Sequence, residues 1–332
     1  MIEKYSKVGI TSIKSLRWWL IAIAVMCVLP LFVPLSVTRL LVMASYLAIF
    51  AMSWDMMSGH TGYISFGHPA LIGLAGYVTA FLSHQEGFQP PHIILPLYVT
   101  LPLGVAAAVG GGMLFFLPSM RVRGPYFALV SLAFMEILHR LVIAIRPEFT
   151  GGDRGLPNQP AVVIGAIPNY YLALGLMFAT AIGLWYVSRS NVGNVLKAIR
   201  MDEDVVEASG ISTYRFKRFA FLLSALTAGL GGVFYTHYLQ SISPRRAFST
   251  IFLLDIIISA VIGGMGTIVG PMFGGYFLTF ILEYLRPYLF GQWRLLAYAL
   301  VAIFMVIYRP RGFYGIAQDV RNWFRARTRE GA

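Results

Sequence analysis

The chain has little charge and almost no cysteine. Charged residues make up 12% of its 332 residues, with 26 basic and 14 acidic side chains, whereas soluble domains carry about twice that share. The single cysteine, Cys27, excludes an internal disulfide, and the six histidines show no spacing typical of a metal site. None of the five lysines follows a glycine, which excludes the phosphate-binding loop of ATPases. The sequence therefore predicts no metal, no cofactor and no ATP site within this chain.

Long apolar runs dominate what remains. Hydrophobic residues form 58% of the chain, the mean hydropathy is +0.70, and apolar runs close to the length of a membrane span recur throughout. The short alternating segments of a transmembrane barrel are not seen. We therefore predict an all-α, polytopic helical membrane protein with about ten spans, or eight if two segments are re-entrant. The predicted spans are residues 18–37, 40–58, 62–83, 93–117, 125–145, 169–188, 218–239, 250–265, 271–289 and 294–308.

The distribution of basic residues predicts the orientation. If the N-terminus is cytoplasmic, 18 lysines and arginines fall on the cytoplasmic side and 7 on the other, a bias that places both termini in the cytoplasm. The chain then divides into a cytoplasmic segment (1–17), a membrane domain (18–308) and a basic tail (309–332) that rests on anionic lipid. Within the membrane domain, loop 146–168 is external and loop 189–217 is cytoplasmic. The net charge of +12 does not indicate nucleic-acid binding, because the basic residues stand at the ends of apolar runs.

Two spans are interrupted by glycine and proline in a similar order. Residues 62–77 and 266–276 each contain a Gly, a short apolar step, a second Gly, a Pro with a Gly four residues later, and a Tyr just beyond. Such breaks in both halves of a membrane protein suggest an inverted repeat around a transport pathway. The alternative is that the small residues serve close helix packing.

A few polar side chains are predicted to lie within the membrane. Glu136 is near the middle of the fifth predicted span, and a carboxylate at that depth should face the bundle interior or a cavity. It could contact an amino group, or it could hold helices together through a hydrogen bond. Asp55, Asp255 and Glu283 are weaker candidates, and His68 is either a packed, neutral histidine or a substrate contact. The residues predicted to line the pathway are Gly62, Ser65, Gly67, His68, Tyr126, Phe127, Glu136, Gly264 and Gly266.

The stretch 189–218 contains ten charged residues between long apolar runs. Because an ion within lipid is costly, the stretch must face a soluble compartment. Asp204, with Glu207 three residues later, fits a capping box, whereas Asp202 could cap a slightly longer helix. The sequence therefore predicts a short helix over residues 203–209.

This short helix is predicted to present Val205, Val206 and Ala208 among acidic residues, and Gly210 is its natural stop. We interpret it as a docking surface for a soluble partner, because signals for topology alone would need only basic residues. The alternative is a solvated loop whose charges set topology. The predicted coupling residues are Arg200, Asp202, Glu203, Asp204, Val205, Val206, Glu207, Ala208 and Gly210.

Several motifs resemble one family when they are taken together, over residues 46–315. The motifs are GHTGYISFGHPA at 59–70, RGPYFA at 123–128, LAFME at 132–136, TGG at 150–152, KAIR at 197–200, IGG at 262–264 and RP at 309–310. They resemble the permease subunits of bacterial ATP-binding-cassette (ABC) importers for branched-chain amino acids, the LivM type. The chain departs from the commonest pattern at Asp55, where Asn is expected, and at Pro69, where a small residue is usual.

The resemblance implies a subunit of the bacterial inner membrane that has no ATPase activity of its own. It would pair with a sister permease, two cytoplasmic ATPase subunits would dock below, and a periplasmic substrate-binding protein would deliver the substrate. Residues 200–210 would then meet the ATPase. A substrate with a carboxylate and an apolar side chain suits helix N-termini and an apolar pathway.

Other functions remain open from the sequence. Related permeases carry urea or other small amides and acids. Glu136, Asp55 and Asp255 could instead be the ion sites of an ion-coupled secondary carrier. The missing catalytic constellation argues against an intramembrane enzyme, and the broken helices argue against a scaffold.

Overall fold

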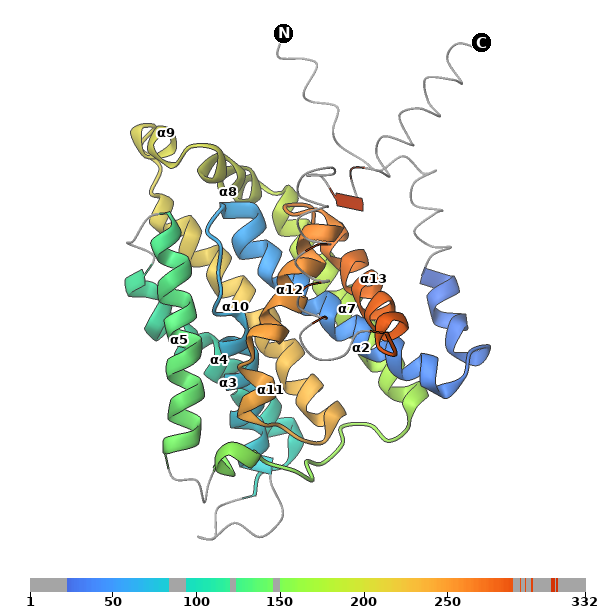
Figure 1. Cartoon of the computed structure of the whole chain (residues 1–332). Helices are drawn as coiled ribbons and strands as arrows, with labels where there is room; N and C mark the ends of the chain where they lie inside the picture. The colour runs from blue at the N-terminus through green and yellow to red at the C-terminus, as the bar shows by residue number, and fades with distance from the viewer. Residues whose placement is uncertain are drawn as a thin grey trace, which may run out of the picture.

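The computed structural model describes residues 23–83, 94–119, 124–145 and 150–288, together with residues 293, 296, 300, 312, 313 and 315. Within these residues every regular element is a helix, and the only bridge between extended residues joins Leu156 to Ile242. The all-α prediction is therefore confirmed for this part of the chain. The helices form a single bundle around a shared apolar core (Figure 1).

The helices of the described residues are named in chain order. Their bounds are η1 (Leu29–Leu31), α2 (Leu35–Trp54), η2 (Asp55–Gly59), α3 (His68–Ser83), α4 (Leu97–Ser119), α5 (Pro125–Ala144), η3 (Gly152–Arg154), α7 (Ala166–Arg189), α8 (Asn191–Met201), α9 (Glu203–Ala208), α10 (Thr213–Leu239), α11 (Pro244–Ala247), α12 (Thr250–Gly263) and α13 (Val269–Leu285).

Six helical segments of the described chain are long and apolar enough to cross a membrane. They are Leu35–Gly59, Leu97–Phe116, Tyr126–Ala144, Ala166–Arg189, Thr213–Leu239 and Pro244–Gly263. Two further apolar helices, α3 and α13, are shorter, and both follow the predicted glycine and proline breaks. The predicted tenth span, 294–308, lies almost entirely outside the described residues.

The first span boundary differs from the prediction. The sequence predicts one span ending at residue 37 and the next beginning at residue 40, but α2 already begins at Leu35, directly after Pro34. Proline has no backbone N–H to continue a helix, so it separates two elements. Pro30 and Pro34, which lie within the predicted span 18–37, are the sequence signal for this boundary.

Helix α2 forms the centre of the bundle. It packs against α7, α10, α12 and α13, and its C-terminal half is almost entirely buried. Glycines allow two of these neighbours to approach closely: a Cβ at Gly231 of α10 would lie 2.7 Å from Phe50, and one at Gly275 of α13 would lie 2.7 Å from Ala48. Close approach at small residues is the usual means of helix association in membranes.

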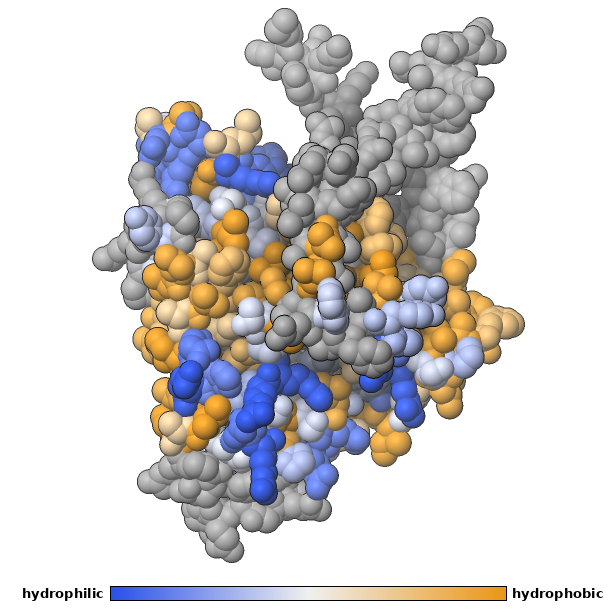
Figure 2. Space-filling view, viewed as in Figure 1, coloured by the Kyte–Doolittle hydropathy of each residue, from blue (hydrophilic) through white to orange (hydrophobic). Residues whose placement is uncertain are grey.

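The two predicted loops lie at opposite ends of the bundle. Helices α8 and α9 close one end, and the segment containing η3, with the neighbouring α11, lies at the other (Figure 1). Figure 2 shows a broad hydrophobic band between them, with hydrophilic residues gathered over α8 and α9 and again toward the opposite end. The arrangement is that of a membrane bundle with two different polar ends.

Candidate functional site

The first interruption follows helix α2. The helix widens into the π-helix η2 at Asp55–Gly59, and residues 62–67 form no regular element before α3 begins at His68. Gly62 has a φ of +80°, and a Cβ at this position would lie 3.2 Å from Cγ of Arg200. Glycine is the residue that tolerates this backbone conformation beside so close a neighbour. The predicted break in this span is thus a turn packed against α8.

The second interruption lies between α12 and α13. Gly264 and Gly266 have φ values of +116° and +81°. A Cβ at Gly266 would lie 2.8 Å from Nη1 of Arg200 and 3.1 Å from the carbonyl oxygen of Gly59. The two interruptions are far apart in the sequence, yet they lie against each other and against the same arginine.

Asp55 holds the two interruptions together. Its carboxylate is fully buried, and it accepts hydrogen bonds from the Gly266 N–H at 2.6 Å and the Ile268 N–H at 3.3 Å. These amides stand just before α13, where a helix leaves its first N–H groups without partners and where negative charge is favoured. His60 Nδ1 lies 3.6 Å from the same carboxylate. Asp55, a departure from the family pattern that the chain resembles, therefore ties the turn before α13 to the end of α2.

Arg200 joins α8 to this junction. Its guanidinium donates a hydrogen bond from Nη1 to the carbonyl oxygen of Gly59. The same side chain packs on Gly62 and Gly266, at the two places where a Cβ would crowd it. The predicted coupling residue Arg200 is therefore in direct contact with both interrupted segments.

Glu203, the first residue of α9, is the centre of a second cluster. Lys217 Nζ lies 2.6 Å from Glu203 Oε1, the Thr213 hydroxyl donates to the same oxygen at 2.9 Å, and the Tyr63 hydroxyl donates to Oε2. Lys217 also donates to the Tyr63 oxygen at 3.0 Å and lies 4.4 Å from the centre of its ring. Only 3% of the Lys217 surface is exposed. The α8–α9 segment thus reaches the first interruption at two points, through Arg200 and through Glu203.

The cluster holds Glu203 in its charged form. Burial alone raises the pKa of this carboxyl, but the hydrogen bonds from Lys217, Tyr63 and Thr213 and the charge of Lys217 outweigh it, so the pKa lies below its ordinary value. A buried ion pair is a poor source of stability compared with apolar packing, yet removing one partner is strongly destabilising. The four side chains are therefore held as a unit.

The helix cap differs in part from the prediction. Asp202 accepts hydrogen bonds from the N–H groups of Asp204 and Val205 at 3.0 and 3.1 Å, so Asp202 is the N-cap of helix Glu203–Ala208. The capping box built on Asp204 is wrong, because Glu207 instead accepts from the Thr213 hydroxyl at 2.6 Å. The extended backbone of Asp202 turns its side chain toward the free amides.

One predicted surface residue is buried. Val205 is 61% exposed and Ala208 is exposed, as predicted, but Val206 is only 7% exposed and packs inward. The exposed apolar surface also includes Met201, which precedes the cap. The chain then turns at Gly210, whose φ is +80°, as the sequence predicts for a helix stop. The outer face of α9 therefore combines an exposed apolar residue with acidic ones.

His68 and its neighbours are packed inside this chain. His68 is fully buried, with Nε2 at 2.8 Å from the Ser224 hydroxyl and Nδ1 at 3.2 Å from the Ser65 hydroxyl. The Trp54 indole N–H donates to the Ser65 carbonyl at 2.7 Å. A Cβ at Gly67 would lie 2.6 Å from the Phe116 ring. This part of the predicted pathway set lies within the bundle, with its polar atoms paired to other helices.

Glu136 lies elsewhere, on an outward face of α5. Its side chain is 50% exposed, and it pairs with Arg140 at 2.8 Å and approaches His139 at 3.7 Å. Tyr126 is also exposed on α5, whereas Phe127 is buried. The surface beside Glu136 and Arg140 is shallow and otherwise apolar, with Ile137, Leu141 and Ile145 along it. The structure therefore does not bring Glu136 together with the glycines and His68.

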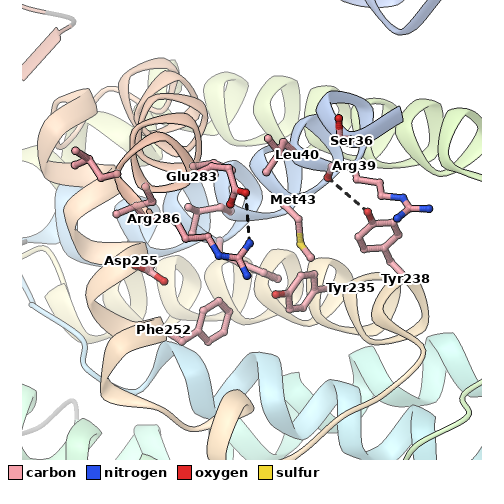
Figure 3. Close-up of a pocket in the computed structure, with 15 residues that line it drawn as sticks. Ser36, Arg39, Leu40, Met43, Tyr235, Tyr238, Phe252, Asp255, Glu283 and Arg286 are labelled. Carbon is pink, nitrogen blue, oxygen red and sulfur yellow. Dashed lines mark hydrogen bonds and ion pairs between the residues drawn. The ribbon is translucent and has the colours of Figure 1, made fainter. Parts of the chain in front are cut away.

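A separate cavity of about 650 Å³ lies among α2, α10, α12 and α13 (Figure 3). It contains two of the weaker sequence candidates, Asp255 and Glu283. Arg286 Nη1 lies 3.4 Å from Glu283 Oε1 across its edge, and the Tyr238 hydroxyl approaches the Arg39 carbonyl at 3.5 Å. The polar residues of its wall are Ser36, Arg39, Tyr235, Tyr238, Asp255, Thr279, Glu283 and Arg286.

Sequence reasoning missed three residues of the Glu203 cluster. Tyr63 was visible only as part of a glycine-rich motif, Lys217 as a charge that marks membrane re-entry, and Thr213 not at all. Their pairing depends on contacts across 140 and 154 positions of the chain, between Tyr63 and Glu203 and between Tyr63 and Lys217. In the described residues no group of three or more His, Cys, Asp or Glu side chains could hold a metal ion.

Comparison with known proteins gives one consistent result. The family described as "Branched-chain amino acid transport system / permease component" matches residues 36–308. The "High-affinity branched-chain amino acid transport system permease protein LivM" of Escherichia coli is 25% identical over 328 residues, covering 89% of this chain and 74% of the relative. The LivM protein of Salmonella typhimurium is 26% identical, covering 80% and 66%. The LivH protein of E. coli is 22% identical, covering 82% and 92%. No solved structure matches the chain.

Proposed function

Because the chain belongs to the family of permease components of branched-chain amino acid transport systems, we propose that it is one membrane subunit of an ABC importer in the bacterial inner membrane. The importer moves branched-chain amino acids inward. Separate ATPase subunits bind on the cytoplasmic side, and a periplasmic binding protein delivers the substrate. The relatives include LivM and LivH, which are named as permease proteins of the same kind of system, and this supports a heterodimer with a sister permease.

The observation that carries this proposal is the construction of the α8–α9 segment. A solvated loop that only sets topology would need no inward contacts, yet Glu203 forms a buried ion pair with Lys217 and Arg200 contacts Gly59. At the same time Val205 is exposed on the outer face of α9. A surface that is exposed outside and anchored inside suits the docking of an ATPase that drives movement of the membrane helices.

The orientation follows from the same surface. If α8 and α9 face the ATPase, this end of the bundle is cytoplasmic, and the end with η3 and α11 faces the periplasmic binding protein. Arg245 and Asp153 pair at that outer end at 2.7 Å. We keep ten spans and cytoplasmic termini as the proposed topology, because the excess of basic residues favours it.

The outward face of α5 supports pairing with a sister permease. Glu136 and Arg140 lie on a membrane-length helix whose exposed side is otherwise apolar, with Leu129, Ile137 and Leu141 exposed. An ion pair facing hydrocarbon is costly, so intramembrane charges face protein or water. We place the sister subunit and the pathway between the subunits on this face, where the Glu136 carboxylate can meet the substrate ammonium group.

The test is reconstitution of the complete complex in vesicles. Leucine should accumulate only when ATP, the ATPase subunits and the binding protein are all present. Accumulation by this chain alone, driven by an ion gradient, would favour the secondary carrier instead. Competition by unlabelled valine and isoleucine, with none by urea, separates a branched-chain amino acid importer from a urea importer.

A further inference from the structure

The short helix α9 has few routes by which it could move the membrane helices. Among the helices it packs chiefly against its neighbours α8 and α10. Its direct link to the first interruption is Glu203, which accepts a hydrogen bond from the Tyr63 hydroxyl. Tyr63 follows Gly62 in the non-helical stretch 62–67, whose Phe66 N–H donates to the Ser131 hydroxyl of α5 at 2.8 Å.

We propose that Tyr63 and Lys217 are positioning residues that transmit movement of α9 to helix α5, the helix that presents Glu136. The proposal rests on the function proposed above and adds the residues through which the ATPase would act. We call Glu203, Tyr63 and Lys217 together the α9 joint.

The joint moves as one body because Lys217 is buried and the Glu203 carboxylate is its close partner. Lys217 and Glu203 are 2.6 Å apart, and Lys217 is almost fully enclosed. Separating them would leave a buried charge without its partner, which is strongly unfavourable. A displacement of α9 by a docked ATPase therefore carries Lys217 of α10 and Tyr63 with it.

Tyr63 passes the displacement on by ring contact. Its ring meets that of Phe127 edge-on, with centroids 5.6 Å apart, and Phe127 is fully buried at the start of α5. Phe127 in turn packs against Phe116 of α4 at 5.7 Å. A close-packed interior transmits small shifts because it has no room to absorb them. The route from α9 to α5 is thus Glu203, Tyr63 and Phe127.

Energetic coupling through the α9 joint is measured by substitution in the assembled importer. The test uses the assembled importer with Lys217→Met, which keeps the length of the side chain and removes its charge. Lys217→Arg is the conservative variant. Arg218→Met is the matched control, because Arg218 is the next residue, carries the same charge and is exposed.

Three quantities are measured in vesicles: copurification of the ATPase subunits, basal ATP hydrolysis, and the stimulation of hydrolysis by leucine-loaded binding protein. Because Lys217→Met also lowers the stability of the chain, the rates are compared per assembled complex: we expect basal ATP hydrolysis at the parental rate, with the stimulation and the leucine uptake reduced about tenfold, a typical size for a coupling energy. Arg218→Met should behave as the parent, and Lys217→Arg should restore most of the stimulation. A residue that only supports the fold would lower copurification and leave the stimulation and the uptake per assembled complex unchanged.

Unchanged stimulation and uptake in Lys217→Met would overturn the proposal that the α9 joint transmits movement, and it would leave the proposed importer function intact. If Lys217→Met fails to assemble, Tyr63→Phe decides, because it keeps the ring packing and removes only the hydroxyl bond to Glu203. Parental stimulation in Tyr63→Phe would then reject the proposal. Failure of the parent chain to bind any ATPase would instead reject the proposed function.

Discussion

Asp55 offers the sharpest test of how the two interrupted helices are joined. Its carboxylate accepts the N–H groups of Gly266 and Ile268 in a fully buried place. Leaving one buried donor without a partner costs about 1–3 kcal/mol. Asp55→Ala leaves both donors unpaired and should therefore lower the free energy of unfolding by about 2–6 kcal/mol. Asp55→Asn keeps one acceptor oxygen and should lose about half of that amount.

The measurement is a denaturant titration of the purified chain in detergent, followed by helix content. The control is Asp153→Ala, which removes an acid from an exposed pair with Arg245 and should cost about 0–1 kcal/mol. We expect the free energy of unfolding to fall in the order parent, Asp55→Asn, Asp55→Ala, with the control close to the parent. If Asp55→Ala were as stable as the control, or Asp55→Asn as costly as Asp55→Ala, the carboxylate would not hold the turn before α13.

Three further outcomes follow from the site. Val205→Glu should weaken copurification of the ATPase and leave the helix bundle intact. Val206→Glu should destabilise the chain by about 2–3 kcal/mol, because it buries an unpaired charge. A pull-down measures the first effect and a denaturant titration the second. The contribution of Glu203 to stability is full above its unfolded pKa of about 4.3 and is lost as the pH falls through its lower folded pKa. The free energy of unfolding, measured against pH in the acid range, should therefore change less in Glu203→Gln than in the parent. An equal pH dependence would contradict the ion pair. Glu136→Gln should lower leucine uptake and leave basal ATP hydrolysis unchanged, so a matching fall in both rates would place Glu136 outside the pathway.

The sequence predicts the polar surface of the site well and its interior poorly. Local patterns reveal the break at Gly62 and the stop at Gly210, because φ preferences are properties of single residues. They also reveal a short helix after Asp202, predicted over residues 203–209 and observed over Glu203–Ala208, because caps and acidic first turns are local signals. The burial of Val206 rather than Val205 depends on which side of a single helical turn faces α10, and six residues give no period from which to infer it.

The pairings within the site lie beyond local pattern. Lys217 was read as a topology signal, since a lysine at the end of an apolar run fits that role. Its partner Glu203 looked like one acid among four. Only the fold, which brings α9 over the start of α10, shows that these two charges neutralise each other. Long-range ion pairs of this kind carry no periodicity, so a single sequence cannot indicate them.

The glycines of the interrupted spans divide into two groups, and the division bears on where transport occurs. Gly67 and Gly275 lie where a Cβ would strike a neighbouring helix, so they serve close packing. Gly62, Gly264 and Gly266 have positive φ values and form turns, and Gly62 and Gly266 lie against Arg200 of α8. Asp55 joins these turns to the end of α2, and Arg200 of α8 is hydrogen-bonded to Gly59 beside them. A movement of α8 would therefore reach the turns directly.

A substrate path needs polar groups that are open to water or to a partner, and within this chain the Glu136 face meets that need better than the packed His68. Glu136 is half exposed on the outward side of α5, whereas both ring nitrogens of His68 are bonded to serines. We therefore infer that the interrupted segments transmit movement and that α5 faces the substrate. The two roles predict opposite effects of substitution: changes at the turns should uncouple ATP hydrolysis from uptake, and changes along α5 should alter which amino acid is carried.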